Sequence, residues 1–352
     1  MSDLRHATTT EKRASPERKL GSYSPSVFAA AEPLRVGVIN NPLSGRSRRG
    51  LGAVKKVLAV HPQVPHRDVQ TPADVASALV DFARKEVNIV VVNGGDGTVQ
   101  EVLTVLFHRG PFESLPLLAV LRAGTTNMTA GDIGLKGSPS HALLRLFSWL
   151  RSREGEVEIV ERSVLRVQAP PNGKPIYGMF LGAAGIYRGI QFCRSKIHTL
   201  GLRGELGPGL ALFLLMLMVK GRKNSGFVSS EPVTVKLDQR LPEEHNFLLL
   251  LISTLERLFL GLRPYWGAEK GPLHYSAVRY SPEHLLRVLP FLLFGRRSRY
   301  ATPENGYFSH NVQEVELTFD SGFTVDGEFY SPDASVGPVV VQNGGQATFV
   351  RL

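Results

Sequence analysis

Apolar runs and helical periods alternate along the first half of the chain. The runs at residues 34–40, 89–92 and 115–121 are short and continuous, and β-branched residues dominate the middle one. Such runs are typical of strands buried on both faces. The segments between them repeat apolar positions at helical spacing, as in residues 98–107. This alternation predicts a parallel sheet with helical crossovers.

The pattern changes near residue 156, where short alternating runs replace the helical periods. They predict a mostly antiparallel second half, a sandwich or open barrel, with helical pieces near residues 190–199, 206–219 and 282–294. We therefore expect an α/β domain at 34–155 and a β-rich domain from 156. Residues 1–33 mix polar and small residues without an apolar period, which predicts a disordered tail.

Three predicted strands end in turns rich in small or polar residues. The turns are Asn41 to Gly45, Gly94 to Thr98 and Arg122 to Asn127. The carboxyl ends of parallel strands share one sheet edge, so these turns should converge there. Glycine lets an anion approach backbone N–H groups, and a following helix N-terminus favours negative charge. Each turn alone could be a plain loop, but three convergent turns favour a phosphate site.

Asp96 is an unusual residue for a phosphate-binding turn. Its carboxylate would repel a phosphate unless a metal ion or water lay between them. Mg²⁺ bound with nucleotide phosphates commonly uses one or two carboxylates. The residue therefore favours a metal-bearing nucleotide over a free anion.

Two carboxylates stand close together near the carboxyl terminus, Asp326 and Glu328, on either side of a glycine. Neighbouring acids in a cleft acquire different pKa values, so one can accept a proton from a substrate hydroxyl. The alternative is a hairpin with Asp-Gly at its tip, a common use of that pair. On these residues alone, the plain hairpin is favoured.

The composition is that of a globular protein with an anionic partner. The 352 residues are 43% hydrophobic and 20% charged, with a formal net charge of +10 and a pI near 9.8. The partner could be a nucleic acid, a nucleotide or an acidic membrane. The single cysteine, Cys193, allows no internal disulfide and suits a reducing compartment. No apolar run reaches the length of a spanning helix or resembles a signal peptide, so we expect a cytoplasmic protein.

Two apolar runs carry cations at their ends. Residues 210–219 precede Lys220, and residues 285–294 precede Arg296 and Arg297. An apolar helix with a basic end suits the surface of an anionic membrane, while core packing is the alternative. The net charge favours the membrane, so we expect peripheral association with its inner face. Nucleic-acid binding is not expected, because the basic residues are not interleaved with aromatics.

The four motifs NPLSG, GGDGT, GTTN and DGE, in this order, resemble the diacylglycerol kinase catalytic family. That family includes bacterial lipid kinases and sphingosine kinases and is distantly related to NAD kinases. The resemblance runs from Leu34 to the end of the chain. GGDGT is shared with NAD kinases, whereas NPLSG is characteristic of the lipid-kinase branch.

This resemblance implies a two-domain NAD kinase/diacylglycerol kinase-like fold. It pairs an N-terminal α/β nucleotide-binding domain with a C-terminal β-sandwich domain for lipid at 156–330, and strands at 331–352 return to the first domain. It also implies that Glu328 is the proton acceptor, with Asp326 beside it, and that Asp96 helps to hold Mg²⁺-ATP. The residues implied to line ATP are Asn41, Pro42, Leu43, Ser44, Gly45, Thr71, Gly94, Gly95, Asp96, Gly97, Thr98, Val99, Gln100 and Thr125.

The chain departs from the family pattern at several positions. Met128 stands where the family usually has an aspartate, and Gln100 where an asparagine is common. In the second half, Leu273 to Tyr275 replace an acidic-glycine pair, so the sequence places no metal site there.

The expected function is an ATP- and Mg²⁺-dependent kinase that phosphorylates a hydroxyl of a diacylglycerol-like lipid. Two alternatives stay open at this point. One is an NAD kinase-like enzyme with a soluble substrate, and the other is a non-catalytic protein that binds lipid or nucleotide. A homodimer also stays open.

Overall fold

The computed structural model describes residues 34–45, 47–152, 154–155, 157–170, 173–191 and 232–352. Several expectations lie outside these residues: the tail at 1–33, Cys193, the apolar run at 210–219 and most of the two predicted helices between 190 and 219. In the described part of the chain, none of the helices combines the length and the apolar character that crossing a bilayer requires.

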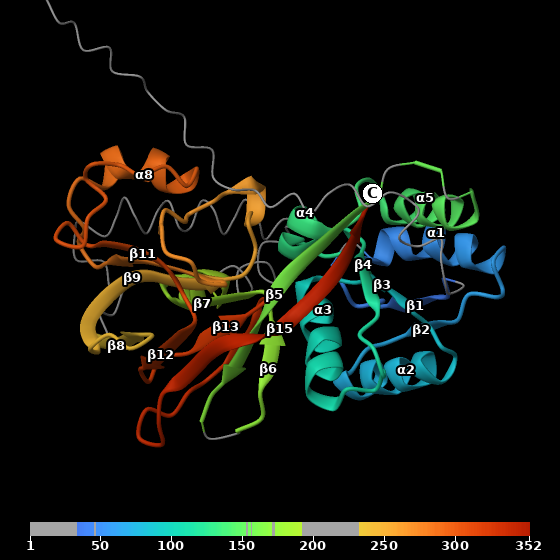
Figure 1. Cartoon of the computed structure of the whole chain (residues 1–352), viewed down its shortest axis with the longest axis horizontal. Helices are drawn as coiled ribbons and strands as arrows, with labels where there is room; N and C mark the ends of the chain where they lie inside the picture. The colour runs from blue at the N-terminus through green and yellow to red at the C-terminus, as the bar shows by residue number, and fades with distance from the viewer. Residues whose placement is uncertain (1–33, 46, 153, 156, 171–172, 192–231) are drawn as a thin grey trace, which may run out of the picture.

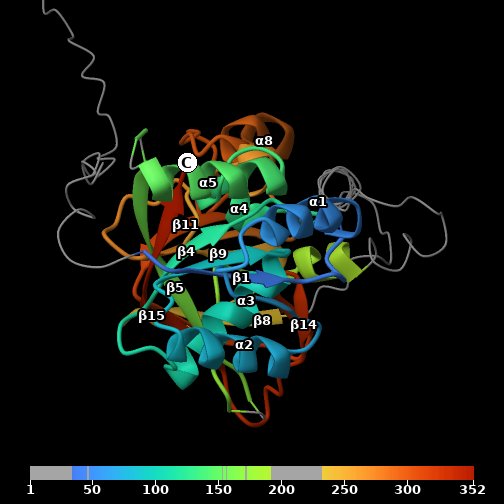
Figure 2. The same cartoon turned by 90° about the vertical axis from the view of Figure 1, so that its right-hand side faces the viewer.

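The first domain is a parallel sheet covered by helices on both faces (Figures 1 and 2). Its strands follow the order β4, β3, β1, β2. Alternate residues of β3 point into different cores, Val90 and Val92 toward one and Ile89 and Val91 toward the other. The bounds are β1 Val36–Asn40, β2 His66–Asp68, β3 Ile89–Asn93 and β4 Leu117–Val120, with α1 Ser47–Ala59 and α5 Pro139–Ser152 on one face and α2 Pro72–Arg84 and α3 Asp96–Thr104 on the other.

The second domain consists of antiparallel strands around its own apolar core. One group of strands runs β14, β13, β7, β9, β10, β11, and β8 and β12 connect it to the long strand β15. The bounds are β5 Glu158–Gln168, β6 Ile176–Gly178, β7 Phe180–Ala184, β8 Pro232–Leu237, β9 Glu243–Ser253, β10 Leu273–Arg279, β11 Tyr307–Val312, β12 Glu314–Thr318, β13 Phe323–Val325 and β14 Glu328–Tyr330, with the short helix η3 at Phe259–Gly261 and α8 at Leu285–Leu293.

The strand β15, Val339–Arg351, belongs to both domains. Its first residues pair with β12, and its whole length pairs antiparallel with β5. Near its end it also pairs parallel with β4, where Phe349 faces Leu118. One hydrogen-bonded sheet therefore runs through the first domain into the second (Figure 1).

Two local features differ from the sequence expectation. The helix α3 begins at Asp96, so only Gly94 and Gly95 form the loop after β3. A short helix, α4 at Met128–Ile133, follows the third turn and has no counterpart among the predicted elements. Its sequence, MTAGDI, contains a glycine and a threonine and has weak helix propensity. Contacts from outside the segment stabilise it, as the next section shows.

Candidate functional site

One cavity of about 750 Å³ lies where the two domains meet. The three predicted turns line one end of it, together with the hairpin between β13 and β14. Apolar residues from β7, β9, β10, η3 and α8 line the other end. The cavity thus has a polar end, built by the turns of the first domain and one hairpin of the second, and an apolar end built by the second domain.

Hydrogen bonds hold the three turns to one another. The Asn41 backbone N–H donates to Asn93 O at 2.9 Å, and its side-chain amide donates to Thr98 Oγ1 at 2.9 Å. The Ser44 hydroxyl donates to Ala123 O at 3.2 Å. The first turn is therefore tied to both of the others, and the convergence expected from a parallel sheet is observed.

Glycine at two turn positions allows this close contact. A Cβ atom on Gly124 would lie 2.6 Å from the Cα of Gly95, and one on Gly45 would lie 2.2 Å from Thr125 Oγ1. The first of these obstacles is backbone, which cannot move aside as a side chain can. Gly124 is therefore needed for the approach of the second and third turns.

Asp96 connects the second turn to α4. Its two carboxylate oxygens accept hydrogen bonds from Thr129 N at 3.0 Å and Met128 N at 3.1 Å. It thereby caps the first turn of α4, where backbone N–H groups lack helical partners. Burial raises the pKa of Asp96, and these backbone bonds oppose that shift. The carboxylate thus has a structural partner as well as a place on the cavity wall.

The acid pair near the carboxyl terminus does lie in a two-residue hairpin loop. Asp326 and Gly327 both have positive φ, 48° and 90°, which suits the tight turn between β13 and β14. Asp326 is buried, and its Oδ2 accepts from Met179 N at 2.8 Å while Oδ1 has no hydrogen-bond partner among the described residues. Burial, and then the charge of Asp96, raise the pKa of Asp326 well above its usual value. The residues thus form a tight hairpin, and the same hairpin places the Asp326 carboxylate on the cavity wall.

Glu328 is exposed and reaches across the domain boundary. Its Oε1 lies 2.7 Å from where a Cβ on Gly97 would be, at the start of α3. Its charge also acts on Glu101, whose pKa is raised by burial first and by Glu328 second. The hairpin of the second domain therefore places a carboxylate directly against the turn of the first.

The structure separates the sequence-predicted residues into two groups. Those that line the cavity are Asn41, Leu43, Ser44, Gly45, Thr71, Gly95, Asp96, Gly97, Thr98, Thr125, Asp326 and Glu328. Pro42, Gly94, Val99 and Gln100 do not line it. Because α3 already begins at Asp96, helical rotation turns Val99 into the core and Gln100 toward Thr104. Thr71 also caps α2, since its hydroxyl accepts from Asp74 N.

Several cavity residues escape prediction from the sequence. Glu101 lies one helical turn after Gly97, so its place on α3 could have indicated it. Tyr330 lies two residues beyond Glu328, on the same side of its strand. Thr126, next to Thr125, belongs to the third turn. The apolar end carries no motif at all.

The apolar end draws its side chains from elements far apart in the sequence. None of these side chains is charged, and the main contributors are Phe180, Ile186, Leu249, Leu251, Leu258, Phe259, Leu262, Trp266, Val278, Leu289, Leu292 and Leu293. An apolar surface of this kind binds hydrocarbon without any directional contact.

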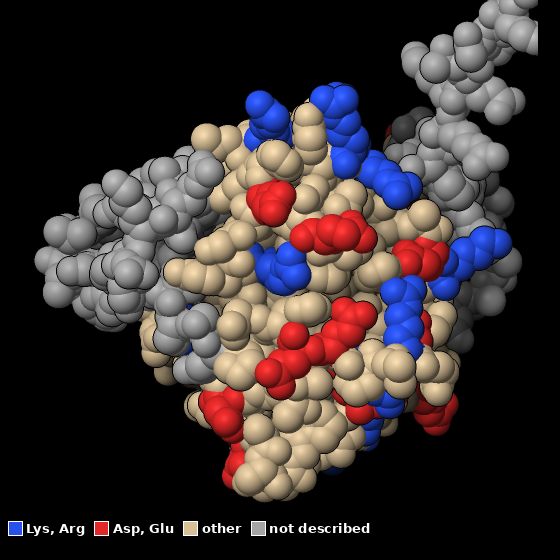
Figure 3. All heavy atoms as spheres, turned by 90° about the vertical axis from the view of Figure 1, so that its left-hand side faces the viewer, with Lys and Arg blue, Asp and Glu red and all other residues tan. Residues whose placement is uncertain are grey.

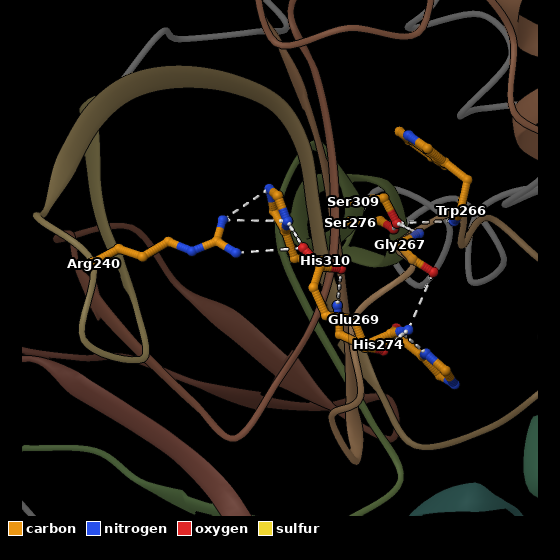
Figure 4. Close-up of polar contacts among 9 residues, drawn as sticks. Arg240, Trp266, Gly267, Glu269, His274, Ser276, Ser309 and His310 are labelled. Carbon is orange, nitrogen blue, oxygen red and sulfur yellow. Dashed lines mark hydrogen bonds and ion pairs between the residues drawn. The ribbon is translucent and has the colours of Figure 1, made fainter.

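A polar network holds the loop that carries Trp266 against β11 (Figure 4). Ser309 Oγ accepts from Trp266 N at 3.0 Å and from Gly267 N at 3.1 Å. Glu269 interacts with His310 and Arg240. Although partial burial opposes it, the bond to His310 and two backbone N–H groups lower the pKa of Glu269 to about 2. This side of the apolar end is therefore fixed in place.

The polar end has the charge of a site for a cation-bearing phosphate. Among the described residues, Asp96, Glu101, Asp326 and Glu328 line it, and no Lys, Arg or His does. A bare phosphate would be repelled there. The described residues contain no cluster of three or more potential metal ligands. Mg²⁺ carried by a nucleotide needs only one or two carboxylates, so the residues present fit that form of the ion.

Comparison with known proteins confirms the family resemblance. Residues 35–159 match the diacylglycerol kinase catalytic domain. The curated diacylglycerol kinase of Bacillus subtilis (strain 168) is 31% identical over 104 residues, which are 29% of this chain and 33% of the relative. The sequence match thus spans about a third of that relative's length.

Solved structures extend the likeness to both domains. A diacylglycerol kinase from Bacillus anthracis str. Sterne has a TM-score of 0.57 and 18% identity, covering 91% of this chain and 97% of that one. A candidate diacylglycerol kinase from the same organism has a TM-score of 0.61 and 19% identity, covering 92% and 99%. At this identity the likeness shows the fold, and the predicted two-domain fold class is confirmed.

We expect Gly124→Ala to disrupt the polar end of the cavity. Its new Cβ meets the Gly95 backbone, so the second and third turns must separate, and ATP affinity measured by calorimetry should fall about tenfold or more. Gly131→Ala is the matched control, because a Cβ there meets nothing within 4 Å. Equal ATP affinity in the two variants would contradict the argument.

We expect Asp326→Asn to stabilise the protein at neutral pH. The raised native pKa means that the native state holds a proton more readily than the unfolded chain. The free energy of unfolding therefore falls as pH rises from the unfolded pKa through the native one, and asparagine removes this loss. The Tm of the variant should exceed that of the wild type at pH 7, and the gap should close toward pH 4.

The control for this measurement is Glu113→Gln, which removes an exposed carboxylate. Thermal melts followed by circular dichroism across the same pH range compare the three proteins. A gap between the Asp326→Asn and wild-type Tm that does not change with pH would show that ionisation of Asp326 does not destabilise the fold.

Proposed function

We propose, from the diacylglycerol kinase catalytic domain that residues 35–159 form, that this protein is an ATP- and Mg²⁺-dependent kinase. It transfers the γ-phosphoryl group of ATP to a hydroxyl of a diacylglycerol-like lipid. The observation that carries the proposal is the single cavity, with phosphate-type turns and carboxylates at one end and a hydrocarbon-lined space at the other. Nucleotide and lipid would meet within it.

The polar end supplies positions for the nucleotide phosphates. Gly95 precedes α3, and Asp96, Gly97 and Thr98 at the start of this helix line the cavity, so the positive end of the helix dipole favours an anion there. The neighbouring turns add the backbone of residues 43–45 and 124–126. Positioning of this kind accounts for much of the catalysis in phosphoryl transfer, which needs little covalent chemistry.

The carboxylates divide the remaining work. When bound with ATP, Mg²⁺ neutralises charge on the phosphates. Asp96 is the residue proposed to hold it. Asp326 is buried too, and the charge of Asp96 helps to raise its pKa. Glu328 is exposed toward the turn at Gly97 and is the proposed acceptor of the lipid hydroxyl's proton. The raised pKa of Asp326 makes it a proton-holding neighbour of that site.

The apolar end distinguishes the proposal from its alternatives. A soluble dinucleotide acceptor would leave the apolar walls from β9, β10 and α8 without a ligand. A non-catalytic binding protein would have no use for Glu328 against Gly97. A hydroxyl on a hydrocarbon body uses both ends of the cavity.

We expect Glu328→Gln to abolish turnover and to preserve the fold. The amide cannot accept the hydroxyl proton, so transfer of labelled phosphate from Mg²⁺-ATP into diacylglycerol micelles should fall about 10²- to 10⁴-fold. ATP affinity and Tm should change little, because the side chain is exposed. Asp96 is less suitable for this test, since it also caps α4.

The matched control is Glu244→Gln, another exposed glutamate. Undiminished transfer by Glu328→Gln would exclude it as the proton acceptor. Transfer to NAD in place of lipid by the wild type would instead identify a soluble-substrate kinase. No transfer to either acceptor, with ATP bound, would identify a non-catalytic homologue.

We expect Leu249→Trp to narrow the acceptor range. Leu249 is partly buried on the cavity wall, so the larger ring would occupy space meant for hydrocarbon. Transfer to long-chain diacylglycerol should fall about tenfold or more relative to a short-chain one, with ATP affinity unchanged. Leu241→Trp, at a site 86% exposed, is the control. An unchanged chain-length profile would contradict a lipid subsite at this wall.

A further inference from the structure

The helix α8 has apolar side chains both on the side that packs against the protein and on its outward side. Leu289 and Leu293 line the cavity, and Leu285 and Val288 pack into a small core with β9 and β10. The remaining large side chains point outward: Leu286 is 66% exposed, Phe291 42% and Phe294, the residue after the helix, 64%. A helix of a water-facing domain would normally carry polar residues there. This outward face therefore needs a partner.

Arginines surround the outward face of α8. Arg287 lies on the helix itself, and Arg296, Arg297 and Arg299 follow its end, all exposed. The chain turns at Gly295, which has a positive φ of 63°, so these residues fold back beside the helix. In Figure 3, Lys and Arg gather along the upper edge of this face, at the level where α8 lies in Figure 1. Of the described residues, Glu283 lies just before the helix and its N–H donates to Asn305 O, next to Glu304, so two acids accompany four arginines here.

A second wall element repeats this arrangement. In and around η3, Leu258, Phe259 and Leu262 line the cavity while Leu260 is 71% exposed. The Arg263 N–H donates to Leu293 O at 3.0 Å and so joins this segment to the end of α8. Both elements therefore line the apolar end of the cavity with some apolar side chains and expose others to the outside.

We propose that α8, with the exposed tip of η3, is the surface that docks on an anionic phospholipid bilayer. Phe291, Phe294 and Leu286 would enter the interface, and the arginines would meet the acidic headgroups. The same helix would then separate the membrane from the apolar end of the cavity. A lipid acceptor would cross this wall without passing through water. The last step rests on the proposed lipid kinase function, whereas the docking does not.

Vesicle binding by the full chain tests the surface without ATP. The probe is sedimentation with vesicles of equimolar phosphatidylcholine and phosphatidylglycerol, compared with phosphatidylcholine alone. The wild type should prefer the anionic vesicles and lose affinity at high salt. Phe291→Ser with Phe294→Ser should weaken binding about tenfold or more, since two aromatic rings lose their apolar environment. Arg296→Glu with Arg297→Glu should remove the preference for phosphatidylglycerol.

Matched controls lie at other exposed sites. Leu241→Ser with Val336→Ser removes apolar side chains that are 86% and 61% exposed, and Arg84→Glu with Arg151→Glu reverses charges on α2 and α5. Unchanged Tm and ATP affinity show that each variant is folded. None of the substituted residues lines the cavity, so transfer to a short-chain, water-dispersed diacylglycerol should also be unchanged in the α8 variants.

Three results would overturn the surface assignment. One is vesicle binding by the α8 variants equal to that of their controls. Another is wild-type binding that is equally strong to vesicles with and without phosphatidylglycerol. The third is light scattering that shows a wild-type dimer and monomeric α8 variants, which would assign the face to a second copy. Docking through α8 with no lipid phosphorylation would contradict the kinase proposal alone.

Discussion

The cavity exists because β15 binds two domains into one sheet. One apolar core contains residues of both domains, such as Val102 and Phe180, and the second domain has a further core of its own, so packing contributes to the relative position of the domains. β5 pairs with β15 along most of its length, and the pairing of Phe349 on β15 with Leu118 on β4 adds a backbone connection that fixes this position. The distance between Glu328 and Gly97 depends on it, since these residues come from different domains. The last strand of the chain therefore determines the geometry of a site built mostly by earlier residues.

Two buried carboxylates at the polar end of the cavity interact unfavourably with each other. Asp96 and Asp326 are buried close enough for the charge of one to raise the pKa of the other. Such a pair destabilises the protein without ligand and becomes favourable when a cation arrives. Asp96 reduces its own cost by accepting two backbone N–H groups of α4. A single carboxylate thus orders the third turn and lies on the wall of the cavity, where we propose that it holds a metal-bearing phosphate.

The apolar end follows a different principle. Its affinity for hydrocarbon comes from area and shape, without directional bonds. One side of this end is fixed by the hydrogen bonds around Ser309. The other side is α8, which is held by the apolar contacts of its buried residues. The same helix exposes the apolar side chains of Leu286 and Phe291 on its outward side. The proposed acceptor and the proposed membrane surface therefore meet at the same helix.

Local sequence was sufficient to predict the turns of the site, because their backbone conformation depends directly on residue type. Glycines and small polar residues after β-branched runs indicated the three turns, and parallel strands required them to converge. Asp326-Gly327 indicated a tight hairpin for the same reason, because positive φ has a residue preference. These signals placed Asn41, Asp96 and Thr125 at one sheet edge, whereas the resemblance to the diacylglycerol kinase catalytic family implied that Glu328 belongs to the same site. The alternation of runs also predicted the two-domain fold class.

Tertiary structure decided what no local preference encodes. The start of α3 at Asp96 turned Val99 and Gln100 away from the cavity, and a one-residue difference in a helix start changes which side faces a ligand. The helix α4 formed where propensity is weak, because a distant carboxylate caps it. The apolar end assembles from β7, β9, β10, η3 and α8, whose leucines resemble any core residues in sequence. Only their packing distinguishes an apolar cavity from a filled core, since the hydrophobic effect has no direction and leaves no motif.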